Sequence, residues 1–286
     1  MQLEIKNISK KYGSNKFGLK EYSINISSGI LGLLGPNGAG KSTLIKIISS
    51  ISKPTAGNIF LDGVDIVKNP NSIRKVLGYL PQDFGVYPNL NAYEFLEYIG
   101  AMKGIGGKGL RQRIEQLLEG VNLIDVAKNK LGTYSGGMKQ RIGIVQVLLN
   151  DPKILIFDEP TVGLDPEERL RFRDLLSDLA SDRIVILSSH IVSDIESIAD
   201  EVAIMKKGEL IIKDSQENII NLATGKVFET TMDKIALSQF KTNYNVVSSY
   251  RLQNEFRVRY IAEKPAENSQ LMTATLEDAY IYATKK

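Results

Sequence analysis

The sequence predicts an α/β protein: a nucleotide-binding core whose strands are covered on both faces, with antiparallel hairpins, a helical subdomain and a small α+β module. One observation is the apolar run "GILGLLG", which ends in glycine and precedes the helical pattern "STLIKIISSI". The other is a pair of continuous apolar runs, "KILIF" and "RIVILSS", on either side of the helical pattern "PEERLRFRDLLSDLA". Such runs are typical of strands that lie inside an α/β sheet.

The first part of the chain is expected to contain antiparallel strands. The segment "LEIKNIS" alternates apolar and polar residues, as a half-buried strand does, and "NIFLDGVDI" is typical of a hairpin that turns at Asp62-Gly63. From about 86 to 150 the pattern becomes helical, with "NAYEFLEYIGAMKG", "GLRQRIEQLLEGV" and "GGMKQRIGIVQVLLN" separated by glycines. This range is the predicted helical subdomain.

The apolar density falls after about Ser215, which follows a hairpin pattern, "VAIMKKGELIIK", that turns at Lys207-Gly208. A short helix, a hairpin around Gln253-Asn254 and a final helix in "TLEDAYIYA" are predicted beyond it. We therefore expect a core domain at 1–214 and a C-terminal accessory domain at 215–286.

Composition excludes several functions. The 286 residues are 43% hydrophobic, which is enough for one large core with or without an appendage. The net charge of +3 is too small for a strongly basic nucleic-acid module, and the absence of cysteine excludes disulfides, thiol catalysis and thiolate metal sites. No apolar stretch approaches the ~18 residues that span a membrane, and no secretory signal is recognised, so any membrane role is expected to depend on a partner.

The segment "GPNGAGKST" matches the phosphate-binding loop pattern at every position, between an apolar strand and a helix. Glycines let successive backbone N–H groups face one anion at the positive end of the helix. Lys41 is expected to reach the β- and γ-phosphates, Ser42 to ligate Mg²⁺ and Thr43 to contact the α-phosphate. The predicted nucleotide-binding residues are Gly35, Pro36, Asn37, Gly38, Ala39, Gly40, Lys41, Ser42 and Thr43.

A second motif, "ILIFDEP", is an apolar strand that ends in adjacent carboxylates. Ligands bind at the C-terminal ends of such strands, so Asp158 is expected to hold Mg²⁺. Glu159 is then free to polarise a water for phosphoryl transfer. The alternative, a strand that runs into a polar turn, loses weight because the same chain carries the phosphate loop.

Four segments occur in the order and approximate spacing of ATP-binding cassette (ABC) ATPases: "GPNGAGKST", "YSGGMKQR", "ILIFDEPTVGLDP" and "SSH". The chain resembles this family over about 1–214, which implies a P-loop NTPase core with an antiparallel β subdomain and a helical subdomain. The resemblance further implies that Tyr12 stacks on adenine, that Gln82 touches Mg²⁺ or the attacking water, that Asp165 lies in the D-loop, and that His190 contacts the γ-phosphate. The alternatives are a strand-end tyrosine, a solvent-facing glutamine, a helix N-cap that is compatible with the D-loop role, and a structural histidine.

The stretch "TYSGGMKQR" at 133–141 raises the question of a second anion-seeking loop. Ser135, Gly136 and Gly137 precede a helix, so a hydroxyl and free N–H groups point outward from a positive helix end. In ABC ATPases this signature completes the site of a second subunit packed head to tail, and the glycines keep side chains clear. Tyr134 and Met138 replace the family's common leucine and glutamine, which puts in question the affinity across the interface but not the role.

Two functions from different classes follow. The first is an ATP-hydrolysing subunit of a membrane transporter, resembling ABC-2-type drug, lantibiotic or bacitracin-resistance exporters. It would work with ATP and Mg²⁺, a permease on a separate chain and a second ATP-binding subunit, on the cytoplasmic face of the cell membrane. The second is a soluble ABC ATPase that moves no solute. Nucleic-acid binding is not expected, because the basic stretches at 46–53 and 205–210 are short and lack interleaved aromatics.

Overall fold

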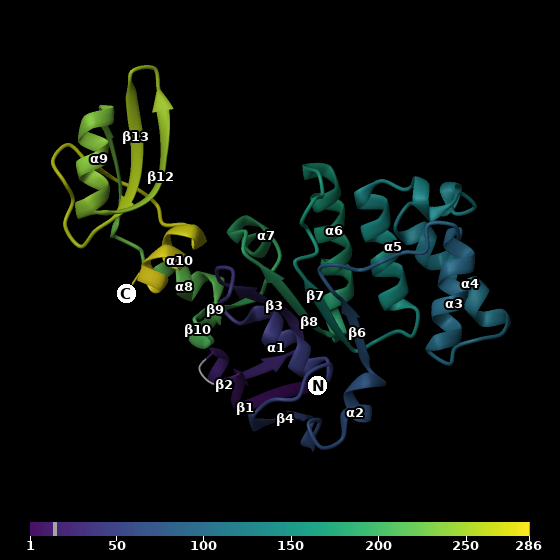
Figure 1. Cartoon of the computed structure of the whole chain (residues 1–286). Helices are drawn as coiled ribbons and strands as arrows, with labels where there is room; N and C mark the ends of the chain where they lie inside the picture. Colours follow the sequence, from purple (N-terminus) through teal and green to yellow (C-terminus); the bar gives the residue numbers. More distant parts are fainter. Residues whose placement is uncertain (14–15, 286) are drawn as a thin grey trace.

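The computed structural model describes residues 1–13 and 16–285, apart from the side chain of residue 108. Three sheets and the helices around them form the described part of the chain (Figure 1). The central six-stranded sheet has the order β10-β9-β3-β8-β7-β6 and is parallel except for β10. Its strands are β3 (Gly29–Leu34), β6 (Leu77–Leu80), β7 (Ile154–Asp158), β8 (Ile184–Ser189), β9 (Glu201–Lys206) and β10 (Glu209–Ser215).

An antiparallel sheet, β2-β1-β4-β5, covers one side of the core. It consists of β1 (Gln2–Tyr12), β2 (Lys16–Ser27), β4 (Ala56–Leu61) and β5 (Val64–Asp65). Helix α1 (Lys41–Ile48) lies between this sheet and the central one, where its apolar residues join both in one hydrophobic cluster (Figure 1). The predicted turn between β4 and β5 is confirmed, with Asp62 and Gly63 at positive φ.

The sequence did not predict β2. Its pairing with β1 is interrupted by register shifts, and Glu21 has a left-handed backbone with φ 45°. Such irregularities break the strict alternation by which a half-buried strand is recognised in a sequence. Strand β6 and helix α2 (Pro70–Arg74) were also not predicted.

Helices cover the other face of the central sheet and extend to one side of it. They are α5 (Gly136–Leu148), α6 (Pro166–Leu179) and the short α7 (Val192–Glu196). Helices α3 (Ala92–Met102) and α4 (Lys108–Gly120) pack with α5 around a separate hydrophobic cluster, followed by the 3₁₀ turns η1 (Ile124–Val126) and η2 (Leu131–Thr133); a third, η3 (Ala180–Asp182), follows α6. Figure 1 shows this helical part beside β6, on the far side from the C-terminal module.

The C-terminal module contains the antiparallel sheet β12-β13-β11-β14, with helix α9 (Lys234–Asn243) packed against it. Its strands are β11 (Val227–Met232), β12 (Asn245–Leu252), β13 (Glu255–Ile261) and β14 (Gln270–Leu271). The turn at Gln253 between β12 and β13 is as predicted, with φ 50°. Strand β11 and helix α9 were not predicted.

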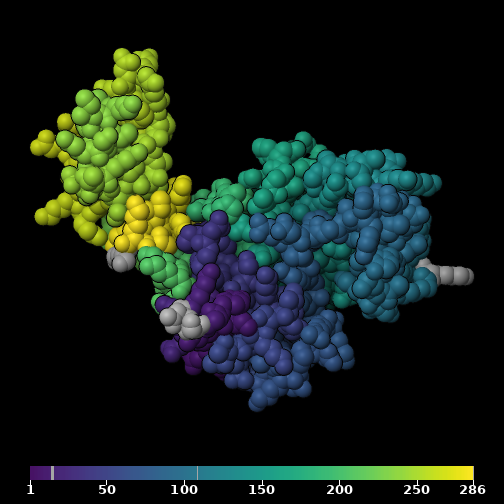
Figure 2. All heavy atoms as spheres, in the orientation of Figure 1, coloured from purple at the N-terminus to yellow at the C-terminus, as the bar shows by residue number. Residues whose placement is uncertain are grey.

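Two helices tie this module to the core. Residues of α8 (Gln216–Asn221) and α10 (Leu276–Lys285) belong to the same hydrophobic cluster as Ile195 of α7 and Val202 of β9. A buried ion pair, Arg259 to Asp278 at 2.6 Å, fixes α10 to β13. Figure 2 shows the sheet and α9 of the module projecting from the body, with α10 at the junction. The core cluster therefore continues across residue 214.

Candidate functional site

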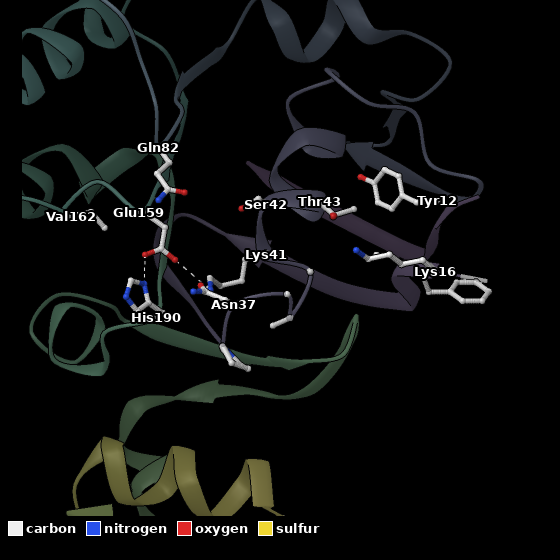
Figure 3. Close-up of a pocket in the computed structure, with 16 residues that line it drawn as sticks. Tyr12, Lys16, Asn37, Lys41, Ser42, Thr43, Gln82, Glu159, Val162 and His190 are labelled. Atoms are coloured by element: carbon white, nitrogen blue, oxygen red, sulfur yellow. Dashed lines mark hydrogen bonds and ion pairs between the residues drawn. The ribbon is translucent and has the colours of Figure 1, made fainter. Parts of the chain in front are cut away.

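A cavity of about 650 Å³ opens where the antiparallel sheet, the loop after β3 and the C-terminal ends of β7 and β8 meet. Tyr12, the loop 36–43, Gln82, Glu159 and His190 line it, as Figure 3 shows. The fold therefore brings together predicted residues that lie up to 178 positions apart (190 − 12). Four further lining residues were not predicted: Lys16, Phe17, Gly18 and Val162.

The phosphate loop is fixed by backbone contacts on both sides. Gly40 has φ 108°, and a side chain there would meet the Gly18 carbonyl oxygen at 2.6 Å, so only glycine fits. The N–H of Gly208 donates to the Ala39 carbonyl at 2.9 Å, and the Gly208 carbonyl accepts from the Lys20 N–H at 2.9 Å. The predicted turn between β9 and β10 thus supports the loop. Gly35 contributes its carbonyl below the loop and does not line the cavity.

Lys41, Glu159 and His190 form one connected group. Nζ of Lys41 donates to the Gly35 carbonyl at 2.6 Å and lies 3.3 Å from Oε1 of Glu159. The other oxygen of Glu159 is 2.6 Å from Nδ1 of His190. Lys41 and Glu159 are almost fully buried, whereas the His190 side chain is 43% exposed and faces the cavity. Both oxygens of this buried carboxylate are therefore engaged, one by a cation and the other by an imidazole at the wall of the cavity.

Asp158 is held by neighbouring hydroxyl groups at the end of β7. Ser188 donates to its Oδ1 at 2.6 Å, and Ser42 donates to the same oxygen at 3.4 Å. Ser188 also accepts from the Glu159 N–H at 3.0 Å, which fixes Glu159 in a left-handed conformation with φ 53°. Burial, followed by the charge of Asp158, raises the pKa of the nearby Tyr79 to about 12, so this phenol stays neutral beside the carboxylate.

The donor groups fit Mg²⁺. Ser42, Asp158 and Gln82 offer a hydroxyl, a carboxylate and an amide oxygen, and Mg²⁺ prefers oxygen ligands. Within residues 1–13 and 16–285, no group of three or more His, Cys, Asp or Glu side chains could hold a metal ion. A metal that takes one carboxylate and completes its shell with phosphate and water agrees with this sparse set.

The second predicted loop lies outside this cavity. Ser135 and Gly136 are exposed at the start of α5, and neither they nor Gly137 or Asp165 line the cavity. Ser135 caps α5 by accepting from the Met138 N–H at 3.1 Å, and Asp165 caps α6 by accepting from the Glu168 N–H at 2.8 Å. Both residues therefore act as N-caps of the helices that follow them.

The two glycines of this loop have different surroundings. A Cβ at Gly137 would lie less than 2 Å from the carboxylate of Glu168, so the Glu168 side chain would have to move before another residue could fit. At Gly136 the nearest atom is a carbonyl oxygen at 4.0 Å. Only Gly136 thus leaves an open surface at the start of α5.

The two departures from the family pattern are directed inward. Tyr134 is 4% exposed, its hydroxyl donates to the Val126 carbonyl at 2.9 Å, and burial raises its pKa. Met138 packs partly buried against the hydrophobic cluster of the helical part. Neither residue changes the exposed surface at Ser135 and Gly136.

Sequence reasoning did not single out Thr161 and Asp194. Thr161 is buried directly beyond Glu159 and Pro160, and it donates to the Asp194 carboxylate at 2.6 Å. Asp194 lies in the first turn of α7. The one sequence signal was that Thr161 lies inside the segment "ILIFDEPTVGLDP" and that Asp194 follows "SSH" by four positions. Their contact depends on β7 and β8 being neighbours in the sheet.

Comparison with known proteins agrees with this geometry. The family model described as ABC transporter matches residues 19–162. The linearmycin resistance ATP-binding protein LnrL of Bacillus subtilis (strain 168) is 39% identical over 211 residues, which cover 73% of this chain and 68% of that protein. YdbJ, an uncharacterized ABC transporter ATP-binding protein of the same organism, is 32% identical over an alignment of 299 residues that covers 99% of this chain and 95% of that protein.

A solved structure shows the same fold. The ATP-binding cassette MJ0796, described as a dimer in a post-hydrolysis state bound to ADP and Pi, superimposes with a TM-score of 0.68 at 28% identity, over 74% of this chain and 98% of that one. The predicted fold class is thereby confirmed. The phosphate loop, the carboxylate-ended strand β7 and these matches together show that the chain belongs to the ABC transporter family, as an ATP-binding subunit that hydrolyses ATP.

Proposed function

We propose that this chain is the energising subunit of a membrane exporter and that two ATP-binding subunits close head to tail on ATP. The observation that carries the proposal is the arrangement of two anion-seeking loops. Lys41, Glu159 and His190 converge in one cavity, whereas Ser135 and Gly136 are exposed outside it. Each chain would then contribute to two nucleotide sites.

The order of residues along the cavity supports the proposed binding roles. Figure 3 shows Tyr12 at one end, Glu159 and His190 at the other, and Lys41, Ser42 and Thr43 between them. This spatial order corresponds to the order of the base, the phosphates and the attacking water. Tyr12, with its ring against Gly18, would stack on adenine, Thr43 would contact the α-phosphate, and Lys41 would bind the β- and γ-phosphates.

The loop 35–40 would bind phosphate oxygens mainly through its backbone. Gly38 has φ 81°, and a side chain there would meet nothing within 4 Å, so this part of the loop is open to a ligand. A succession of N–H groups at the N-terminus of α1 favours negative charge.

In the hydrolysis step, Glu159 would accept a proton from the attacking water. Its Oε1 now contacts Lys41, so phosphate oxygens that bind Lys41 would release this carboxylate oxygen for the water. His190, which holds Oε2 at 2.6 Å, would orient the carboxylate and contact the γ-phosphate. Ser42, Asp158 and Gln82 would hold Mg²⁺, which would neutralise charge on the phosphate oxygens.

The head-to-tail dimer is supported by the surface at the start of α5. The Ser135 hydroxyl and the N–H groups of Gly136 and Gly137 belong to a helix N-terminus, where the dipole favours a phosphate. Asp165, the N-cap of α6, lies near this surface, since Glu168 in the first turn of α6 lies against Gly137. The match to the dimeric cassette MJ0796 adds support.

A permease on a separate chain would carry the substrate. Within the part of the chain that the structure describes, no helix has the length and apolar character needed to cross a membrane. Two exposed apolar side chains lie on α3, Tyr98 (44% exposed) and Met102 (70%). Tyr87, 52% exposed, lies in the segment between Gln82 and α3. We propose that the permease docks on these residues, on the cytoplasmic face of the membrane. Export is supported by the resistance function named for the relative LnrL.

We further propose the division into an ATPase domain at 1–214, with its helical subdomain at about 86–150, and an accessory domain at 215–286. The separate sheet of the C-terminal module supports this division. The relative YdbJ aligns over 99% of the chain and therefore also spans this module.

Affinity capture from detergent-solubilised membranes tests the transporter role. We expect a polytopic membrane protein to co-purify with the wild-type chain. Less of this protein should co-purify with the double variant Tyr98→Ser/Met102→Ser. The matched control is Ile235→Ser, since Ile235 is 79% exposed on α9; this variant should capture as much of the membrane protein as wild type does. Capture of soluble proteins alone would contradict the transporter role.

A further inference from the structure

The two groups proposed to act on the attacking water come from different segments. Glu159 lies in the loop after β7, and His190 follows β8. Their side chains meet through the contact of 2.6 Å between Oε2 and Nδ1. A reacting geometry of this kind depends on the relative placement of the two segments, and a displacement of about 1 Å can lower a rate by about 100-fold.

A buried carboxylate joins the same two segments a short distance away. Asp194 follows His190 by four positions on α7, and its side chain is 7% exposed. Its Oδ2 accepts from the Thr161 hydroxyl at 2.6 Å, and Thr161 follows Glu159 by two positions. Its Oδ1 lies 3.6 Å from Nη1 of Arg169, in the first part of α6.

Arg169 extends this contact along the loop. Its Nε donates to the Leu164 carbonyl at 3.2 Å, directly before Asp165. Both partners of Asp194 thus belong to the segment that leads from Glu159 to the start of α6. Because both lie outside α7, the carboxylate joins two segments and does not merely cap its own helix.

We propose that Asp194 is a positioning residue for ATP hydrolysis. By binding Thr161 and Arg169, it fixes α7 against the loop after β7, and this sets His190 against Glu159. The inference rests on the proposed roles of Glu159 and His190 and adds a residue that touches neither nucleotide nor water. Hydrogen bonds to an ionised acceptor are stronger than neutral ones, which suits a contact that must hold two loops in register.

The kinetic test compares isosteric changes in the full-length chain. We expect Asp194→Asn and Thr161→Val each to lower kcat by about 10-fold while KM for ATP changes by less than about 2-fold, because the phosphate loop lies elsewhere. Thr161→Ser keeps the hydroxyl and should restore turnover. The kcat of the double variant Thr161→Val/Asp194→Asn should lie within about 2-fold of the kcat of either single variant, because both substitutions remove the same hydrogen bond.

Asp182→Asn is the matched control. Asp182 pairs with Lys153 at 2.9 Å and so also joins the segments of β7 and β8, but at the opposite ends of these strands. Its side chain is 59% exposed. This variant should keep wild-type kcat and KM.

A second readout does not depend on turnover. His190 is the only histidine in the chain, so a protein without an affinity tag gives a single set of imidazole signals in an NMR spectrum. We expect Asp194→Asn and Thr161→Val to shift these signals in the same direction as Glu159→Gln does, or to broaden them. Thr161→Ser and Asp182→Asn should leave the signals unchanged.

A fall in kcat with shifted His190 signals, both restored by Thr161→Ser, would support the inference. Wild-type kcat in Asp194→Asn would overturn it, as would a loss of activity with unchanged His190 signals, because Asp194 would then not act by positioning His190. Glu159→Gln, measured alongside, separates the two proposals. If Glu159→Gln is inactive while Asp194→Asn turns over normally, the role of Asp194 alone is wrong; wild-type turnover in Glu159→Gln overturns both.

Discussion

The ammonium group of Lys41 lies 3.3 Å from Oε1 of Glu159, although one residue belongs to the phosphate loop and the other directly follows strand β7, 118 positions away (159 − 41). Both side chains are almost fully buried. This ion pair joins the group proposed to bind phosphate to the group proposed to activate water, so changes at the two ends should have separable effects.

Glu159→Gln should retain ATP binding and lose hydrolysis by at least about 100-fold, the scale for removing a general base. The amide keeps the shape of the side chain but cannot accept the proton. Phosphate release and nucleotide affinity are measured on the same preparation. Glu167→Gln, which changes an exposed glutamate on α6, is the control and should hydrolyse ATP normally. Near wild-type turnover in Glu159→Gln would exclude this residue as the base.

Lys41→Ala should weaken nucleotide binding itself, because the cation on the β- and γ-phosphates is lost. The change also leaves the buried Glu159 carboxylate without its nearest cation, so thermal stability is measured in parallel. Lys46→Ala changes an exposed lysine on the same helix and should bind ATP as wild type does. Unchanged ATP affinity of Lys41→Ala by calorimetry would contradict the proposed phosphate site.

Ser135→Arg tests the head-to-tail dimer. A bulky side chain at the exposed start of α5 would stand where the partner's triphosphate must enter, so ATP-dependent dimerisation should be abolished while the monomer still binds ATP. Light scattering with and without ATP measures this in the Glu159→Gln background. Ser177→Arg, near the opposite end of α6 from Asp165, should dimerise normally. If Ser135→Arg dimerises as well as its parent, Ser135 is only the cap of α5.

Asp278→Asn should destabilise the chain by about 3 kcal/mol at about pH 7, the scale for removing one partner of a buried ion pair. Burial alone would raise the pKa of Asp278, but the hydrogen bonds from Arg259 and Thr275 outweigh this and hold it below the usual value of 3.8. Because the folded-state pKa is lowered, the carboxylate contributes its stability above the unfolded-state value and loses it as the pH falls through the folded-state value. Urea unfolding should therefore show a difference between variant and wild type that is largest at about pH 7 and shrinks as the pH falls further below 3.8. A difference that stays the same over this pH range would contradict this assignment.

Removal of 215–286 should lower the melting temperature, because α8 and α10 cover Ile195 and Val202 in the core cluster. The cavity residues all lie between positions 12 and 190, so any truncated chain that remains folded should still bind ATP. Differential scanning fluorimetry with and without ATP separates the two effects. A folded truncated chain that no longer binds ATP would show that the module helps to form the site.

The sequence by itself determined the fold class and most of the cavity residues, whereas Lys16, Phe17, Gly18 and Val162 were not predicted. The phosphate loop requires glycines at fixed spacing within a few residues, and a continuous apolar run directly precedes the two carboxylates after β7. Both signals are therefore local in the chain. Tyr12, Gln82 and His190 were placed by motif order, and the structure brings them to the same cavity. Local hairpin turns, such as Lys207-Gly208, were predicted for the same reason.

Only the tertiary structure decided which segments touch. Strands β7 and β8 are consecutive in the chain, with α6 between them, and their pairing in the sheet brings Thr161 to Asp194; this contact leaves no periodic signal in the sequence. The close approach of the Glu168 carboxylate to Gly137 likewise follows from the placement of the start of α6 beside α5. The same holds for α10, whose apolar residues join strands of its own module and the core residues Ile195 and Val202 in one hydrophobic cluster.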